Sequence, residues 1–147
     1  MGGAAMIGLG LALAQPKRRV LVLTGDGEML MGLGALATIA VAAPANLAIA
    51  VIDNERYGET GMQETHTGHG VDLAGMARAA GFKDARTVVI AAELDSAVQA
   101  LYAAPGPAFA DIKVSAERPA MVLPPRDGTY LKHRFRTAVL GAAAAGA

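Results

Sequence analysis

Polar side chains follow two short apolar runs of this chain, with the residue types that a metal-bound diphosphate needs. The run at residues 20–24 is followed by Gly-Asp-Gly, which places a carboxylate at Asp26. The run at residues 47–52 is followed by Asp-Asn, which places an amide at Asn54. Mg²⁺ takes oxygen ligands, commonly one or two side chains together with phosphate and water. The pair therefore predicts a site for Mg²⁺ and a bound diphosphate, and with it a cofactor enzyme.

The residues around Asp26 also favour a bound anion. Gly25 and Gly27 allow the backbone to turn sharply and to approach a ligand closely. A helix expected from Glu28 directs its free N–H groups toward the same place. The turn through Arg56 can add a main-chain carbonyl. A lone Gly-Asp-Gly is more often an ordinary turn, so the prediction depends on both motifs together.

Helices and apolar strands alternate along the chain, and this order positions both motifs. The pattern predicts helices at residues 2–15, 28–42, 73–80 and 93–103, and strands at residues 19–24, 47–53, 87–90 and 108–114. Asp72 is expected to cap the third helix and Gly81 to end it. The order indicates an α/β fold, a parallel sheet with helices on both faces and strands buried on both sides. Ligands of such sheets bind beyond the carboxyl ends of the strands, where both motifs lie.

Two segments fall outside this alternation. Residues 54–71 have no apolar period and predict a long loop, which in a compact domain is usually functional or disordered. Prolines interrupt the chain from residue 119 onward, and a final helix is expected from Tyr130. We therefore expect a cofactor-binding domain at residues 1–114 and a tail at residues 115–147, in which His133, Arg134 and Arg136 form a surface or subunit-contact patch.

Composition removes several classes of function. The chain has 147 residues, which is enough for one domain with its own core, and its formal net charge is zero, which argues against a nucleic-acid partner. It contains no cysteine, so disulfides, thiolate catalysis and cysteine-bound metals are excluded. The apolar segment at residues 2–14 is followed, not preceded, by basic residues and is too short to span a bilayer. We expect a cytoplasmic protein without a membrane segment.

The paired motifs resemble those of thiamine-diphosphate enzymes. Gly25-Asp26-Gly27 and Asp53-Asn54 look like the diphosphate motif of that family, and residues 1–8 resemble the segment that precedes it. Residues 54–63, 71–73 and 77–82 are most similar to the sulfopyruvate and phosphonopyruvate decarboxylase branch. Asp53 replaces the first Asn of the usual Asn-Asn pair, whereas the second, which binds the metal in the family, is kept as Asn54.

The resemblance implies a set of site residues. Asp26 and Asn54 would bind Mg²⁺ through their side chains, and Arg56 through its carbonyl. Gly27 and Glu28 would offer backbone N–H groups to the diphosphate of thiamine diphosphate. The other implied cofactor-binding residues are Met1, Gly2, Gly25, Ile52, Tyr57 and Gly58. Because the family motif begins before Met1, either the start of the chain lies upstream or the first strand comes from elsewhere.

The resemblance also implies a partner and a reaction. In the family, a Glu on a separate pyrimidine-binding domain activates the cofactor, and no second α/β domain is visible in this chain. Because sulfopyruvate-decarboxylase-like enzymes divide the two domains between subunits, we expect a hetero-oligomer with a pyrimidine-binding partner subunit that supplies this Glu. The expected reaction is the decarboxylation of a small 2-oxoacid.

Residues of the loop after Asn54 are candidates for proton transfer. Glu59, His66 and His69, together with Glu64, have side chains suited to that step. For each of them taken singly, a solvated polar residue on a mobile lid is the favoured interpretation. His66 and His69 lie three positions apart, but no further zinc ligands are near them in the sequence.

Three other functions share parts of this pattern. The chain could be a fragment of an acetolactate-synthase-like carboligase, or a non-catalytic module that binds a nucleotide or diphosphate. The β subunit of 2-oxoacid:ferredoxin oxidoreductases shares the motif, but the absence of cysteine argues against it. Mg²⁺-dependent binding of thiamine diphosphate separates the enzymes from the regulatory module.

Overall fold

The computed structural model describes residues 1–118, 120 and 122–142 of the chain. These residues form two compact units, Met1–Ala116 and Glu117–Ala147. Each unit is described by itself.

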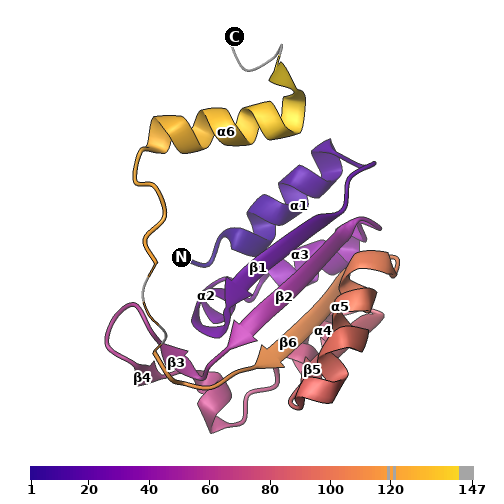
Figure 1. Ribbon diagram of the computed structural model, residues 1–147. Coiled ribbons are helices and arrows are strands. Elements are labelled where there is room, and N and C mark those ends of the chain that lie inside the picture. Colours follow the sequence, from indigo (N-terminus) through magenta and orange to yellow (C-terminus); the bar gives the residue numbers. More distant parts are fainter. Residues whose placement is uncertain (119, 121, 143–147) are drawn as a thin grey trace. The chain divides into compact units, whose positions relative to one another are not determined.

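The first unit is built on a parallel four-stranded sheet (Figure 1). The strands are β1 (Val20–Gly25), β2 (Leu47–Asp53), β5 (Asp84–Val88) and β6 (Ala108–Lys113), and they lie in the order β1-β2-β6-β5. All three neighbouring pairs are parallel. This arrangement confirms the predicted α/β fold, and β2 has the predicted bounds.

Helices cover both faces of this sheet (Figure 1). They are α1 (Ala4–Ala14), α2 (Asp26–Met31), α3 (Ala35–Ala42), α4 (Leu73–Ala80) and α5 (Leu94–Ala103), with short 3₁₀ turns η1 (His66–His69) and η2 (Ala91–Glu93). A core cluster joins helices α1 to α4 to one face, and α5 packs against the other face. The second unit contains α6 (Gly128–Leu140), which begins two residues before the position predicted for a final helix.

The central strand β2 shows where two of the chain's many alanines are needed. Its large residues Leu47, Ile49 and Val51 belong to the core cluster under α1, α3 and α4. Alternate residues Ala48 and Ala50 belong to the cluster that contains Leu101 of α5 and the alanines of β6. Successive side chains of a strand point to opposite faces, so the small residues let α5 approach the sheet closely.

The predicted helix at residues 28–42 is wrong, because the structure has two helices there. The break falls at Gly32, which follows α2 and precedes α3. A Cβ built on Gly32 would lie 2.0 Å from the carbonyl oxygen of Gly2. The backbone at Gly2 therefore occupies the space that a side chain at position 32 would need, and the N-terminal segment lies against the break.

Two strand predictions also differ from the structure. Strand β1 is not buried on both sides: Leu23 is 67% exposed, because the cluster under α5 is made mainly from β2 and β6. Strand β5 runs over Asp84–Val88 instead of residues 87–90, and Val89 and Ile90 are exposed. The apolar run at Val88 to Ile90 misled the prediction, since strand preference depends on packing against neighbours.

The predicted loop at residues 54–71 contains short regular pieces. Strands β3 (Arg56–Tyr57) and β4 (Gln63–Glu64) form a small antiparallel pair, and η1 follows them. The next helix begins as predicted, because the Asp72 side chain accepts a hydrogen bond from the N–H of Gly75, and Gly81 ends it in a left-handed conformation. Among the described helices, none combines the length and apolar character needed to cross a membrane.

Candidate functional site

The carboxyl ends of β1, β2 and β6 bring three buried acids to one end of the sheet. Asp53 ends β2, Asp111 lies near the end of β6, and Asp26 follows β1 directly. Their side chains are almost completely buried. Register places Gly25 beside Ile52 and Asp53 beside Lys113. Buried carboxylates are rare unless they are paired, so the partners of each acid decide what this end of the sheet can do.

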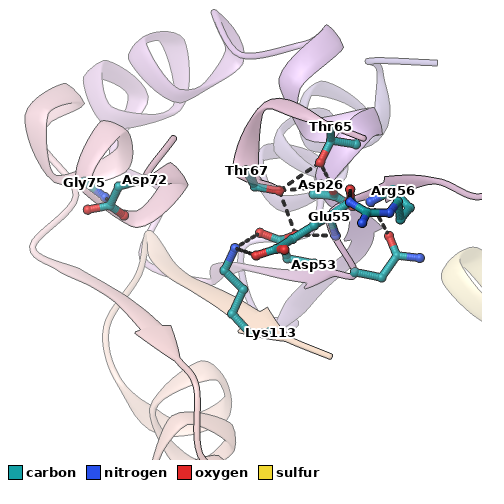
Figure 2. Close-up of polar contacts among 10 residues, drawn as sticks. Asp26, Asp53, Glu55, Arg56, Thr65, Thr67, Asp72, Gly75 and Lys113 are labelled. Carbon is teal, nitrogen blue, oxygen red and sulfur yellow. Dashed lines mark hydrogen bonds and ion pairs between the residues drawn. The ribbon is translucent and has the colours of Figure 1, made fainter. Parts of the chain in front are cut away.

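Asp26 is held by two threonine hydroxyls from the loop (Figure 2). Thr65 Oγ1 donates to Asp26 Oδ2 at 2.5 Å, and Thr67 Oγ1 lies 3.3 Å from the same oxygen. The two hydroxyl oxygens are 2.9 Å apart. Both threonines are buried. Within the described residues Asp26 forms no ion pair, so its negative charge has no counter-charge from a lysine, arginine or histidine.

Asp53, in contrast, is paired with a cation (Figure 2). Lys113 Nζ lies 2.9 Å from Asp53 Oδ2 and 2.9 Å from Glu55 Oε1. The other carboxylate oxygen, Asp53 Oδ1, accepts from Thr67 Oγ1 at 2.8 Å and from the N–H of Glu55 at 2.9 Å. The departure from the family's Asn at position 53 is therefore matched by Lys113, its register partner on β6.

Asp111 is the third buried acid. Its Oδ1 atom has no hydrogen-bond partner among the described residues. The pKa of Asp111 is raised to about 7, first by burial and then by the charge of Asp53, with Lys113 opposing the rise. Near neutral pH this group therefore carries a proton for part of the time.

The segment after β2 forms a tight turn at the two other predicted metal ligands. Asn54 Oδ1 accepts from the N–H of Arg56 at 3.0 Å, and the Arg56 carbonyl accepts from the N–H of Gly58 at 3.1 Å. Glu55 between them has φ 60°, a left-handed conformation that is uncommon for residues other than glycine. Each of these oxygens retains a second lone pair. Their roles as ligands stay predictions.

Tyr57 lies directly over the Gly-Asp-Gly turn. A Cβ built on Gly27 would lie 2.6 Å from two carbon atoms of the Tyr57 ring, so only glycine allows this approach. Gly25 precedes α2 with extended backbone. Ile52 is partly exposed at 37%, and Gly58 is exposed. The structure thus brings Gly27 and Tyr57 into contact, and their roles in cofactor binding stay predictions.

Glu28 has a role that sequence reasoning missed. Its carboxylate accepts from the N–H of Ala4 at 2.9 Å and from Thr24 Oγ1 at 2.6 Å. Burial raises the pKa of Glu28, but hydrogen bonds from Thr24 and from the backbone of the first residues outweigh this effect and leave it below its usual value. The side chain thereby fixes the segment that contains Gly2 close to the start of α2. Met1 itself is largely exposed.

The proposed proton-transfer residues are exposed and are not gathered into one cluster. His69 Nε2 lies 3.2 Å from Glu64 Oε2, and Arg56 pairs with the other oxygen of Glu64 at 3.1 Å. Glu59 and His66 are exposed. In the part of the chain that the structure describes, no three or more histidines and acids are grouped so as to hold a metal ion.

Thr65, Thr67, Asp111 and Lys113 were not singled out by sequence reasoning. One signal was present, because Asp111 and Lys113 interrupt a strand that is otherwise apolar, and an acid inside a buried strand requires a partner. The threonines carry no comparable signal, since a Thr in a polar loop is ordinary.

Comparison with known proteins identifies the class of this domain. Residues 1–112 match the family "Thiamine pyrophosphate enzyme, C-terminal TPP binding domain". Over 142 residues the chain is 40% identical to the sulfopyruvate decarboxylase subunit beta of Methanothermobacter thermautotrophicus, covering 97% of this chain and 73% of that protein. The chain belongs to this family of thiamine-diphosphate-binding domains, in the branch that contains the sulfopyruvate and phosphonopyruvate decarboxylases.

Other relatives share a smaller part of their length. The phosphonopyruvate decarboxylase of Streptomyces viridochromogenes is 40% identical over 114 residues, which are 78% of this chain but 28% of that protein. In fold, the chain is similar to a thiamine diphosphate-dependent 4-hydroxybenzoylformate decarboxylase of Rhodococcus jostii, with a TM-score of 0.63 and 22% identity over 82% of this chain and 24% of that one. This structural likeness bears on the fold alone.

Proposed function

We propose that this chain holds the Mg²⁺ ion and the diphosphate of thiamine diphosphate in a 2-oxoacid decarboxylase, and that a second subunit completes the active site. The observation that supports this most directly is Asp26, a buried carboxylate without a counter-charge among the described residues, beside Asp53, which has one. Leaving a buried charge uncompensated is costly. A divalent cation at Asp26 removes that cost.

The donor set fits such an ion. Mg²⁺ binds hard oxygen atoms and is commonly held by one or two side chains with phosphate oxygens and water. Asp26 offers a carboxylate, Asn54 a neutral amide oxygen and Arg56 a main-chain carbonyl. The turn that holds the latter two is fixed by its own hydrogen bonds. One carboxylate with two neutral oxygens leaves room for the negative charge of a diphosphate.

The chain's own residues have defined tasks in this reaction. When bound, thiamine diphosphate supplies the electron sink for decarboxylation. The backbone N–H of Gly27 would bind the diphosphate, and Ile52 and Tyr57 would border the cofactor. Loop residues Glu59, His66 and His69 are the candidates for moving a proton to or from the substrate.

A partner subunit follows from the relatives. The protein of M. thermautotrophicus is described as a subunit beta, which implies another subunit in that enzyme. We propose the same arrangement here, with a pyrimidine-binding partner that supplies the activating Glu, and a cytoplasmic location for the hetero-oligomer. The substrate is a small 2-oxoacid, with sulfopyruvate and phosphonopyruvate as the first compounds to test because the relatives are named for them.

The test uses the full chain co-purified with the product of the neighbouring open reading frame. Titration calorimetry should show binding of thiamine diphosphate that requires Mg²⁺, and 2-oxoacids should release CO₂. Asp26→Asn keeps the shape of the side chain but removes its charge, and we expect metal-dependent binding to fall by at least about 10-fold. Asp95→Asn, at an exposed acid of α5, is the matched control.

Two results would contradict the proposal. Normal turnover by Asp26→Asn would show that the ligand assignment is wrong. Tight binding of a nucleotide without any binding of thiamine diphosphate would favour the non-catalytic module. Product analysis separates decarboxylation from carboligation, since the first yields an aldehyde and the second a larger hydroxyketone.

A further inference from the structure

The two carboxylate oxygens of Asp26 have different surroundings. Both threonine hydroxyls approach Oδ2, Thr65 at 2.5 Å and Thr67 at 3.3 Å. Within the described residues, neither Thr65 nor Thr67 forms a hydrogen bond to Oδ1. A carboxylate with one oxygen held by a buried hydroxyl presents its other oxygen in a fixed direction, which is the function that hydrogen-bond partners of metal ligands serve.

Each threonine hydroxyl can donate one hydrogen bond, and this limit decides which carboxylate accepts from which threonine. Each hydroxyl has one proton, and the two shortest contacts to carboxylates are Thr65 to Asp26 at 2.5 Å and Thr67 to Asp53 at 2.8 Å. Thr65 therefore donates to Asp26, and Thr67 donates to Asp53 while lying 2.9 Å from Thr65. The pair connects the acid that follows β1 with the acid that ends β2 (Figure 2).

The connection is buried, which makes it strong. Thr65 is 0% exposed and Thr67 is 4% exposed, so water does not replace a lost hydroxyl without rearrangement. A hydrogen bond to a charged acceptor is stronger than one between neutral groups. The backbone adds a further tie, since the N–H of Thr65 donates to the carbonyl of Glu55 at 3.0 Å.

We propose that Thr65 is a positioning residue for the metal: its hydroxyl holds Oδ2 of Asp26 so that Oδ1 is directed to the cation, and it attaches the loop to the metal ligand. Thr67, which donates to Asp53 and lies 2.9 Å from the Thr65 hydroxyl, supports Thr65 in this position. This inference rests on the proposed function. It also explains how a loop with exposed histidines keeps a fixed place relative to the cofactor, because His66 lies between the two threonines in the sequence.

The test compares Thr65→Val with Thr65→Ser in the full chain co-purified with its partner. Val keeps the shape and removes the hydroxyl, whereas Ser keeps the hydroxyl. Mn²⁺ binding is measured by the electron paramagnetic resonance signal of free Mn²⁺ in the presence of thiamine diphosphate. We expect Thr65→Val to weaken Mn²⁺ binding about 10–100-fold and Thr65→Ser to stay within about 3-fold of wild type. Thr60→Val, at an exposed hydroxyl of the same loop that bonds Gln63, is the matched control.

Two further readouts separate positioning from general destabilisation. The melting temperature of the metal-free complex should change little in Thr65→Val, whereas the increase produced by adding Mg²⁺ should shrink, because ligand stabilisation depends on the dissociation constant. The Mg²⁺ concentration for half-maximal activity should rise while kcat at saturating Mg²⁺ is kept. If Thr65→Val does not fold, Thr65→Ala, which also lacks the hydroxyl, takes its place in the comparison with Thr65→Ser.

The outcomes are distinguishable. Absence of Mn²⁺ binding by the wild-type complex would overturn the proposed function and this inference together. Wild-type binding with an unchanged Thr65→Val would overturn the positioning role and leave the proposed function standing. Equal loss in the Val and Ser variants would also overturn it, because the hydroxyl would then not be the cause.

Discussion

Three buried carboxylates lie at one end of the sheet, and each of them has different neighbouring groups. Asp26 accepts from the Thr65 hydroxyl, Asp53 pairs with Lys113 and accepts from Thr67, and Asp111 receives no full counter-charge. Two negative groups close together cannot both stay charged without compensation. Burial and the charge of Asp53 accordingly raise the pKa of Asp111 to about 7.

A pH dependence of stability follows for Asp111. Its pKa of about 7 in the folded chain lies above the ordinary value of 3.8, so the folded state binds the proton more tightly than the unfolded state. Its contribution to stability is therefore present below about pH 4 and is lost as the pH rises toward 7. Asn does not titrate, so the Asp111→Asn variant does not lose stability in this way. The free energy of unfolding of the variant minus that of wild type should therefore increase steadily from pH 4 to pH 7.

Urea unfolding of the full chain across this range measures the difference. Asp95→Asn, an exposed acid on α5, should give a curve parallel to wild type. If Asp111→Asn were parallel as well, Asp111 would have the same pKa in the folded and unfolded states.

Sequence reasoning located some of these residues and missed others for a physical reason. Asp26 and Asn54 were found because each comes two positions after an apolar run, and the carboxyl ends of parallel strands are where ligands bind. Their position at this end of the sheet follows from local order alone. Thr65, Thr67 and Lys113 act on acids far away in the chain, and only the folded loop and the register of β6 bring them there.

At the scale of elements, the break between α2 and α3 is the feature that the helical pattern concealed. The residues from 28 to 42 are apolar and suited to one helix, but Gly32 is where the N-terminal segment touches the chain. The Glu28 carboxylate also holds that segment, because it accepts a hydrogen bond from the N–H of Ala4. The break is thus produced by tertiary contact and not by local preference, which is why the sequence pattern could not reveal it.

Two glycines at this break should respond oppositely to substitution. At Gly32 a new Cβ would lie 2.0 Å from the backbone of Gly2, whereas at Gly34 nothing lies within 4 Å. Gly32→Ala should lower the free energy of unfolding by about 1–3 kcal/mol through overpacking. Gly34 has helical backbone with φ −58°, so Gly34→Ala should leave the stability unchanged or raise it by about 0.4–1 kcal/mol.

Denaturant unfolding of Gly32→Ala, Gly34→Ala and wild type measures the three free energies of unfolding. Equal stabilities would mean that the segment at Gly2 does not rest on Gly32 in solution. A loss of stability in Gly32→Ala alone would support the contact between Gly2 and Gly32.

At the scale of the whole chain, the described residues form two compact units, and every residue of the two core clusters belongs to the first. The family match also ends within that unit, at residue 112. We propose that residues 1–114 form the cofactor-binding domain and that the tail after it is a separate segment for subunit contact. A parallel sheet covered on both faces supplies its own core, so the first unit should not need the tail to fold.

Truncation tests this division. A chain ending at Ala116 keeps all four strands of the sheet and should unfold in one cooperative transition, with a melting temperature within a few degrees of the full chain. A chain ending at Gly106 is the control, because it removes β6, the strand between β2 and β5, and with it Lys113, the counter-charge of Asp53. That shorter chain should fail to fold.

Circular dichroism melting of both truncated chains, with calorimetry on the longer one, gives the comparison. A non-cooperative transition in the Ala116 truncation would show that the tail is part of the folding unit.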